Sequence, residues 1–339
     1  MSFIKTDDNV NLFYETNGTG EPIIFVHEFA GDYRSWAPQV NYFSRFNQCI
    51  TYCARGYHPS DIPEDEIKYS QERAWQDIIN LMDNLKIEKA HIVGLSMGGF
   101  ATLHLGIQAP HRVRSLVIAG CGYGAIPIEK TTYNQDADFT NVSFDTAQNI
   151  INKGMEVVGS EYALGPSRVQ FQNKDPKGWQ LFNDQLVKHD AVGSANTLLG
   201  VQNKRPNLYE LEKEISSINS PTLIINGDED DMCLEVGLFL KRTIKTSGLL
   251  TVPKTGHTIN LEEPALFNHH LSEFHHSIYV LYKLNDIQMN LYFESIHIQL
   301  ISISERYHYL HMGMVRIMGH VHRLIENLLC IKSKVQTYL

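Results

Sequence analysis

The hydrophobic positions divide most of the chain into short apolar segments that alternate with helical patterns. Gly, Pro or polar clusters bound the segments, and most segments are continuously apolar, which is typical of strands buried on both faces of a parallel sheet. Two segments at 3–5 and 10–14, separated by a turn sequence, predict a β-hairpin ahead of them. The buried strands are predicted at 23–26, 49–53, 91–95, 113–119, 222–225 and 249–252.

Helical patterns lie between these segments. Residues 71–85 are representative, because their apolar side chains recur on one stripe of a helix. A repeated strand–helix order predicts a mainly parallel sheet with helices on both faces, and therefore an α/β fold.

One long stretch, residues 123–217, interrupts this order. It contains no convincing strand, and helical patterns occupy 145–158 and 178–187. An insertion of this size between two sheet strands predicts a helical lid. We therefore expect a core formed by 1–122 and 218–276, with the lid at 123–217.

The last part of the chain, residues 277–339, differs in composition. All 12 prolines lie at or before Pro264. A stripe of apolar residues with spacings of three and four follows. It predicts either a docking or oligomerising helix, or a poorly ordered extension whose periodicity is accidental. The stripe consists of Met314, Ile317, Val321, Leu324, Leu328, Ile331 and Val335.

Charge and composition exclude several classes of protein. The net charge of -9 argues against nucleic acid or an anionic membrane as a partner. No apolar run approaches the roughly 18 residues of a membrane span, and the N-terminus lacks the pattern of a signal peptide. Five cysteines without framework spacing predict reduced thiols. These features predict a cytoplasmic globular protein.

A G-x-S-x-G sequence, residues 94–98, lies where a predicted strand meets a predicted helix. The motif is weak alone, but in this context it predicts a sharp turn that exposes Ser96 at the carboxyl edge of the sheet. Gly94 and Gly98 would let the strand and helix backbones approach each other. Ser96, near the positive end of a helix, is the candidate nucleophile.

A serine nucleophile needs a base, and 16 histidines compete for that role. His257 follows the last predicted strand and enters a loop at the same sheet edge as Ser96. His91 lies within a strand and His104 within the helix after Ser96, so both are predicted to be structural. The four histidines at 269, 270, 275 and 276 spread around a helix without a carboxylate or cysteine partner, and we expect no metal site there.

The carboxylate that orients the base should follow the strand at 222–225. Four adjacent acids occupy 228–231. Alternate residues of a turn point in opposite directions, so Asp228 and Asp230 could face the same way. Local reasoning leaves the choice between them open.

Five short sequences carry a resemblance to a known family: Val26-His27-Glu28-Phe29, Arg55-Gly56-Tyr57-His58-Pro59-Ser60-Asp61, Gly94-Leu95-Ser96-Met97-Gly98-Gly99, Gly227-Asp228-Glu229-Asp230 and Gly256-His257. In these sequences the chain resembles the α/β-hydrolase superfamily over about residues 3–275, and most closely its enol-lactone hydrolase, carboxylesterase and haloperoxidase-like group. The resemblance implies an α/β-hydrolase fold with a helical lid. It selects Asp230 as the acid and assigns the oxyanion hole to the backbone N–H groups of Phe29 and Met97. It implies no cofactor and no metal.

Glu28 departs from the family pattern, because glycine usually follows the histidine at this position. A carboxylate directed into the site would oppose an oxyanion. We therefore expect Glu28 to point away from the site and to pair with Arg34 or Arg55.

The expected function is hydrolysis of a small carboxylic ester or lactone by Ser96, His257 and Asp230 through an acyl-enzyme. C–C bond hydrolysis, peracid formation and ligand binding without catalysis are the alternatives. The lid is expected to choose the substrate. Its candidate lining residues are Tyr162, Phe171, Trp179, Phe182 and Leu198.

Overall fold

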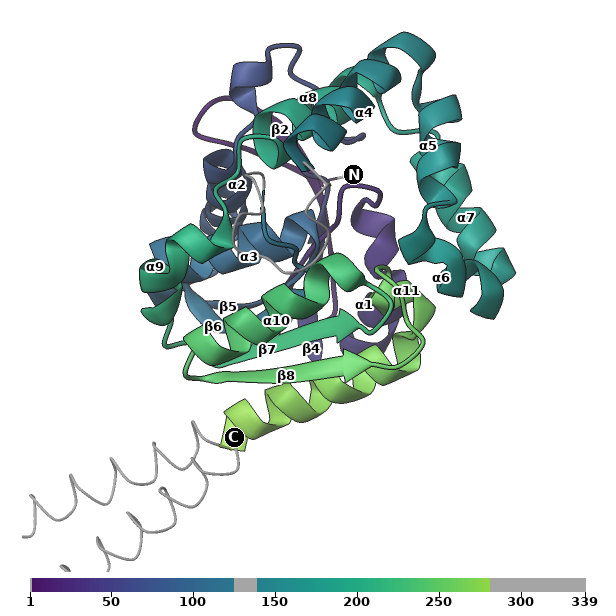
Figure 1. The fold of residues 1–339 in the computed structure, drawn as a ribbon. Coiled ribbons are helices and arrows are strands. Elements are labelled where there is room, and N and C mark those ends of the chain that lie inside the picture. The colour runs from purple at the N-terminus through teal and green to yellow at the C-terminus, as the bar shows by residue number, and fades with distance from the viewer. Residues whose placement is uncertain (1, 125–138, 281–339) are drawn as a thin grey trace, which may run out of the picture. The chain divides into compact units, whose positions relative to one another are not determined.

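A computed structural model describes residues 2–124 and 139–280, and one eight-stranded sheet runs through it (Figure 1). The strand order is β1-β2-β4-β3-β5-β6-β7-β8. β1 pairs antiparallel with β2, and β2 pairs antiparallel with β4, whereas the other neighbours are parallel. The strands are β1 Ser2–Lys5, β2 Asn11–Asn17, β3 Glu21–Val26, β4 Asn47–Tyr52, β5 Ala90–Leu95, β6 Val113–Ala119, β7 Thr222–Gly227 and β8 Ser247–Val252.

The predicted strands and the N-terminal hairpin are confirmed. β5 shows why the apolar pattern was informative, since all six of its residues are buried in the middle of the sheet. The hairpin turn uses Asn9 at φ 70, a left-handed conformation that asparagine tolerates better than most residues.

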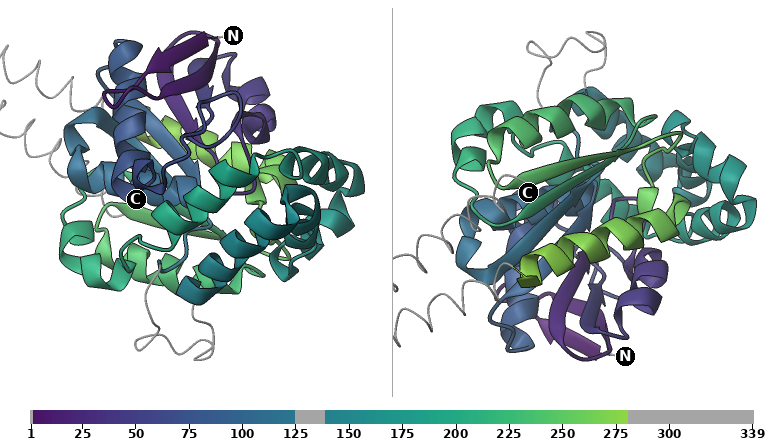
Figure 2. Two further views of the ribbon diagram at one scale, coloured as in Figure 1. Left: turned by 90° about the horizontal axis from the view of Figure 1, so that it is seen from above. Right: turned by 90° about the horizontal axis from the view of Figure 1, so that it is seen from below.

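Helices cover both faces of the sheet (Figure 2). The predicted helix at 71–85 is α2, which starts behind the capping hydroxyl of Ser70 and buries Ile78, Leu81 and Met82 in the main core. The helices of the core are α1 Ala37–Phe43, α2 Gln71–Asn84, α3 Met97–Gln108, α10 Asp231–Thr243 and α11 Ile259–Glu262, and a further helix covers 264–280.

The predicted helical insertion between β6 and β7 is confirmed, because its described residues form helices and turns. One detail of the prediction is wrong: the pattern at 145–158 is two helices, broken at Gly154, whose φ of 79 no regular helix accommodates. The insertion contains α4 Phe139–Lys153, α5 Met155–Ala163, the turn Pro166–Arg168, α6 Val169–Lys174, α7 Pro176–Leu186, α8 Ala191–Asn196, η5 Thr197–Gln202, η6 Leu208–Leu211 and α9 Glu212–Ser216.

Two close backbone approaches dock the insertion on the carboxyl edge of the sheet. A Cβ atom on Gly193 of α8 would collide with the backbone of Gly56, in the loop after β4. A Cβ atom on Gly256, after β8, would collide with the carbonyl of Ser167. The insertion therefore rests on loops that leave the sheet at the edge where Ser96 is predicted.

A second hydrophobic cluster joins this edge to the insertion. It includes Phe29 and Met97 from the core, together with Phe171, Phe182 and Leu198 from the insertion. The phenol ring of Tyr162 packs edge-on against the ring of Phe29, with the two ring centroids 5.6 Å apart. Trp179 is partly buried against the cluster. The predicted lining residues thus form much of the apolar contact between the two parts.

Cys49, Cys53, Cys121 and Cys233 are free and buried, as predicted. No helix in the described ranges combines the length and the apolar character that a membrane crossing requires. The predicted stripe from Met314 to Val335 lies outside the described residues.

Candidate active site

Ser96 lies at the turn between β5 and α3 with φ 55 and ψ -114, a conformation that non-glycine residues rarely adopt. Its N–H donates to the Ala119 carbonyl at 2.8 Å. The flanking glycines are required by space, because a Cβ on Gly94 would collide with the backbone of Gly98, and one on Gly98 with the carbonyl of Val26. The sharp turn therefore presents the hydroxyl at the carboxyl edge of the sheet.

His257 and Asp230 meet at the same edge. The distance from His257 Nδ1 to Asp230 Oδ2 is 2.7 Å. The loop of His257 is tied to the insertion by its N–H, which donates to the Ser167 carbonyl at 2.9 Å. The imidazole lies against Gly120, where a Cβ would approach Cε1 and Nδ1 to 3.3 Å. These contacts fix the ring with Nδ1 toward the carboxylate.

The pKa values of this pair fit an ionised acid and a base. Burial alone would raise the pKa of Asp230, but His257, the Cys233 thiol and Arg168 hold it below its ordinary value. Burial alone would lower the pKa of His257, but Asp230 holds it above the ordinary value. A neutral His257 carries its proton on Nδ1, which donates to Asp230, so Nε2 is left to accept a proton.

Other acids of the 228–231 group have different partners. Asp228 Oδ1 accepts the N–H of Thr255 at 3.2 Å and so braces the loop before His257. Glu229 Oε2 accepts from Gln170 Nε2 of the insertion at 2.7 Å. The geometry therefore agrees with the choice of Asp230 over Asp228.

Within residues 2–124 and 139–280, no hydrogen bond joins Ser96 Oγ to His257 Nε2. Such bonds are often long in free enzymes and shorten once substrate is bound. The three predicted triad residues are thus gathered at one edge, with the acid–base bond already formed.

The N–H groups of Phe29 and Met97 make no hydrogen bond within the described part of the chain. The peptide that carries the Phe29 N–H is held by His27. His27 Nε2 accepts from the Ala54 N–H at 3.0 Å, so Nδ1 bears the proton and donates to the Glu28 carbonyl at 2.7 Å. Because a trans peptide is planar, fixing that carbonyl turns the Phe29 N–H the opposite way.

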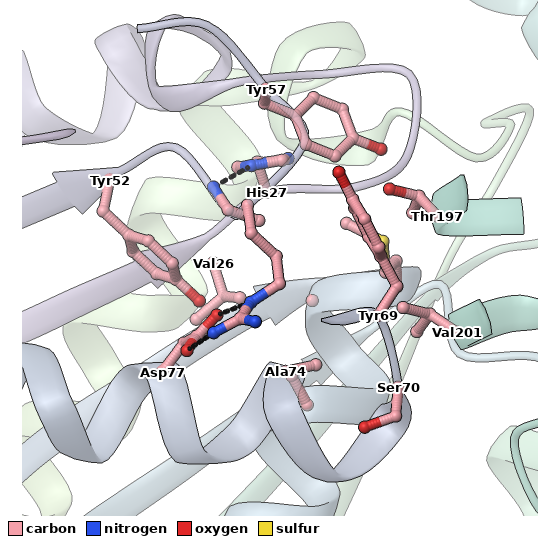
Figure 3. Close-up of a pocket in the computed structure, with 15 residues that line it drawn as sticks. Val26, His27, Tyr52, Tyr57, Tyr69, Ser70, Ala74, Asp77, Thr197 and Val201 are labelled. Carbon is pink, nitrogen blue, oxygen red and sulfur yellow. Dashed lines mark hydrogen bonds and ion pairs between the residues drawn. The ribbon is translucent and has the colours of Figure 1, made fainter. Parts of the chain in front are cut away.

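Two further details keep this loop in place. Burial lowers the pKa of His27 to about 4, so the ring stays neutral and keeps its acceptor near neutral pH. The Tyr57 hydroxyl donates to the Phe29 carbonyl at 3.0 Å. Figure 3 shows His27 and Tyr57 side by side, with ring centroids 4.6 Å apart.

A cavity of ≈ 30 Å³ lies behind this loop (Figure 3). The side chains of Tyr57, Tyr69 and Thr197 line this cavity. Met97 and Gly98, at the start of α3, also line it. A space of this size is large enough to hold water. Ser96, Asp230 and His257 do not line it.

The prediction for Glu28 is wrong. Its carboxylate is buried, with 1% of the residue exposed, and points toward the candidate site. Oε2 lies 2.7 Å from Arg168 Nη2 and 3.9 Å from His257 Nε2. Sequence reasoning failed because the partner comes from the insertion, 140 residues away along the chain.

The arginines proposed as partners are occupied elsewhere. Arg34 pairs with Asp32, and Arg55 pairs with Asp77 and Asp8. The Glu28 backbone is also free of left-handed strain, since Glu28 is not among the non-glycine residues with positive φ in the described ranges.

One group of potential metal ligands occurs in the described residues: Asp230, Cys233 and His257 have ligand atoms within 4.8 Å of one another. Oxygen, thiolate and imidazole are ligands that zinc accepts. Here, however, the Asp230 and His257 atoms are engaged in their mutual hydrogen bond. Cys233 is buried, and its thiol helps to hold the pKa of Asp230 below the ordinary value. The three residues are therefore the acid–base pair and its surroundings.

Sequence reasoning missed several groups at this edge: Arg168, Thr258, His27, Tyr57 and Cys233. His27 and Tyr57 were visible only as parts of family motifs. The others gave no local signal, because their partners lie on distant segments of the chain.

Comparison with known proteins agrees with this geometry. The family model described as alpha/beta hydrolase fold matches residues 21–264. A putative 2-succinyl-6-hydroxy-2,4-cyclohexadiene-1-carboxylate synthase of Bacillus subtilis is 25% identical, over 81% of this chain and 98% of that protein. The 3-oxoadipate enol-lactonase 1 of Acinetobacter baylyi is 27% identical, over 76% of this chain and 89% of that protein.

Among solved structures, an enol-lactonase from Burkholderia xenovorans LB400 superposes with a TM-score of 0.70. It covers 80% of this chain and 99% of its own chain at 22% sequence identity. At that identity the similarity shows the fold alone.

Proposed function

The chain belongs to the alpha/beta hydrolase fold family, and on that premise we propose that it is a serine hydrolase acting on a small carboxylic ester or lactone. One observation carries the proposal: the strained Ser96 turn and the His257–Asp230 hydrogen bond of 2.7 Å share one edge of the sheet. A nucleophile, a base and an orienting carboxylate are the parts that acyl transfer through a serine requires.

In the first half-reaction, His257 Nε2 takes the Ser96 proton while Oγ attacks the carbonyl carbon. The carbonyl oxygen gains negative charge, and the N–H groups of Phe29 and Met97 donate to it. Preorganised donors of this kind lower the barrier because they need no rearrangement when the charge appears. The alcohol leaves with the proton from His257, and an acyl-enzyme remains.

In the second half-reaction, His257 takes a proton from water as the water oxygen attacks the acyl carbon. The bond between that carbon and Ser96 Oγ breaks, and Oγ recovers the proton from His257. Asp230 stays ionised and holds the ring in the required tautomer.

The substrate class rests on the surroundings of Ser96. Phe29, Met97 and Phe182 belong to one apolar cluster, which favours a small acyl group with apolar character. The lid, with the boundaries expected from the sequence, would choose among such substrates. The resemblance to an enol-lactonase supports a lactone as one member of the class.

Labelling with a fluorophosphonate probe tests the nucleophile. We expect the folded parent protein to be labelled and Ser96→Ala and His257→Ala to lose labelling. Ser216→Ala, which changes an exposed serine of α9, is the matched control and should label like the parent. A folded parent protein that takes no label would refute the proposal.

Product analysis then tests the bond type. Short-chain p-nitrophenyl esters and small lactones should be hydrolysed, with Ser96→Ala slower by at least about 10⁴-fold. Turnover confined to a diketone, or peracid formation in place of hydrolysis, would replace the ester hydrolase proposal with one of its alternatives.

A further inference from the structure

The Glu28 carboxylate lies beside the His257 nitrogen that activates water in the proposed mechanism. Glu28 directly precedes Phe29 in the loop after β3. Its Oε2 is 3.9 Å from His257 Nε2, the nitrogen that takes the proton in the proposed mechanism. This separation is too long for a direct hydrogen bond, but one water molecule can bridge two acceptors at that distance.

The other carboxylate oxygen of Glu28 can accept further hydrogen bonds. Glu28 Oε1 is buried and has no hydrogen-bond partner within the described part of the chain. A buried acceptor without a donor destabilises the folded state, and more so if it is charged. Such a cost is tolerated at a site where the donor arrives from outside the protein, as water or substrate does.

Arg168 explains how a carboxylate is compatible with an oxyanion hole beside it. Arg168 Nη2 donates to Glu28 Oε2 at 2.7 Å, and each side chain is 1% exposed. Its Nη1 donates to the Thr258 hydroxyl, next to His257 in sequence. The guanidinium charge opposes that of Glu28, and its bond to Oε2 fixes the orientation of the carboxylate.

Tyr162 and Phe182 keep the guanidinium in position. Its Cζ atom lies 5.5 Å from the centroid of the Tyr162 ring and 5.0 Å from that of Phe182. Both rings belong to the insertion, so the insertion sets the direction in which Glu28 presents its free acceptor.

We propose that Glu28 is a catalytic residue of the second half-reaction, in which it orients the attacking water. The inference rests on the proposed function. The water donates one hydrogen to His257 Nε2 and the other to the Glu28 carboxylate, so that an oxygen lone pair faces the acyl carbon. The water O–H bond breaks toward Nε2, the new C–O bond forms, and the bond to Ser96 Oγ breaks as Oγ recovers the proton. Glu28 remains ionised throughout.

This role separates the two half-reactions. During acylation the Ser96 hydroxyl is itself the donor to His257 Nε2, and no water takes part. Loss of the Glu28 acceptor therefore slows deacylation and leaves acylation nearly unchanged. A purely structural role of Glu28 would change both half-reactions together.

The test uses the full chain and p-nitrophenyl acetate. Release of p-nitrophenol in the first turnover reports acylation. The acetyl-enzyme, freed of excess ester, is then followed by intact-mass spectrometry to measure its decay. In Glu28→Gln the amide oxygen keeps the bond to Arg168, and the amide NH₂ replaces the free acceptor with a donor. We expect acylation within about threefold of the parent and an acetyl-enzyme lifetime at least about tenfold longer.

Glu262→Gln is the matched control. Glu262 is also buried and also pairs with a cation of the insertion, Lys174 at 3.0 Å, but it bonds the Gly256 N–H rather than facing His257 Nε2. We expect its ratio of acylation to deacylation rates to stay within about threefold of the parental ratio.

A second variant keeps the inference testable if Glu28→Gln fails to fold. Glu28→Met combined with Arg168→Met replaces the buried pair with apolar side chains of similar volume, a change that folds often tolerate. It should also lengthen the lifetime of the acetyl-enzyme at least about tenfold.

The outcomes are distinguishable. An acetyl-enzyme that decays at the parental rate in Glu28→Gln, or equal slowing of both half-reactions, overturns this inference and leaves the proposed function intact. A folded parent protein that forms no acetyl-enzyme and takes no fluorophosphonate label overturns both.

Discussion

Arg55 and Arg168 are both buried beside carboxylates, and they differ in how completely they are hydrogen-bonded. All three guanidinium nitrogens of Arg55 donate, to both oxygens of Asp77, to both oxygens of Asp8 and to the Lys68 carbonyl, at 2.7–3.0 Å. Arg168 donates to Glu28 and Thr258, while its Nε and Glu28 Oε1 have no partner in the described residues.

The difference follows from position. Asp8 lies in the hairpin turn, Asp77 on α2, and Arg55 in the loop after β4, so the Arg55 network ties together three segments of the core. A buried ion pair offsets its desolvation cost only when its hydrogen bonds are nearly all made. The Arg168 pair is incomplete, and it lies at the one sheet edge where water and substrate would supply further partners. We call the Arg55 pair saturated, because its hydrogen bonds are nearly all made, and the Arg168 pair unsaturated. A saturated pair indicates a structural role, and an unsaturated pair beside a base indicates a role in the reaction.

The largest predicted effect is on the saturated pair. Asp77→Ala leaves the Arg55 charge buried and only partly compensated, and we expect a stability loss of about 3–5 kcal/mol. Urea unfolding measures it. Esterase activity per folded molecule should stay within about threefold of the parent. A stability loss below about 1 kcal/mol would contradict the structural reading of this network.

The next effect is on the unsaturated pair. Arg168→Met leaves Glu28 unopposed beside the proposed oxyanion hole, and we expect kcat/KM to fall about 10²–10³-fold, as on loss of one oxyanion-hole donor. Steady-state kinetics on an activated ester measure the fall. In the double variant with Glu28→Gln the repulsion is removed, and kcat/KM should recover by at least about tenfold. Additive losses in the double variant would argue against coupling through the charge.

A smaller effect concerns pH. His257 must be neutral to accept a proton, so kcat/KM rises with pH through the His257 pKa, which Asp230 holds above the ordinary value against the effect of burial. Glu28 also raises this pKa and Arg168 lowers it. The acid limb should therefore move to lower pH in Glu28→Gln and to higher pH in Arg168→Met. In Asp77→Asn, which belongs to the saturated pair, the limb should stay where the parent has it.

The smallest predicted effect concerns a solvent-exposed salt bridge. Lys204 Nζ and Glu66 Oε1 form a salt bridge at 2.5 Å, with 65% of the lysine side chain exposed. Solvent screening and side-chain entropy cancel most of such an attraction. We expect Lys204→Ala to change the free energy of unfolding by less than about 0.5 kcal/mol in urea titrations. A loss near that of Asp77→Ala would show that burial does not explain the comparison.

Much of the fold was predictable because its signals are local. Continuous apolar runs identified the strands, and Gly94 and Gly98 marked a turn that only glycine can make. The break at Gly154 was missed because a single glycine inside a helical pattern does not by itself show whether the helix ends there.

At the candidate site, local patterns named Ser96 and His257, and family spacing was needed to choose Asp230. The sequence alone determined the α/β class, the order of the strands along the chain and the sheet edge at which the candidate residues gather. Only the tertiary structure decided the surroundings of Glu28. Its direction depends on Arg168, 140 residues later in the insertion. A charge interaction of this kind depends on distance in space and on the exclusion of water, and neither is written in the spacing of residues along a chain.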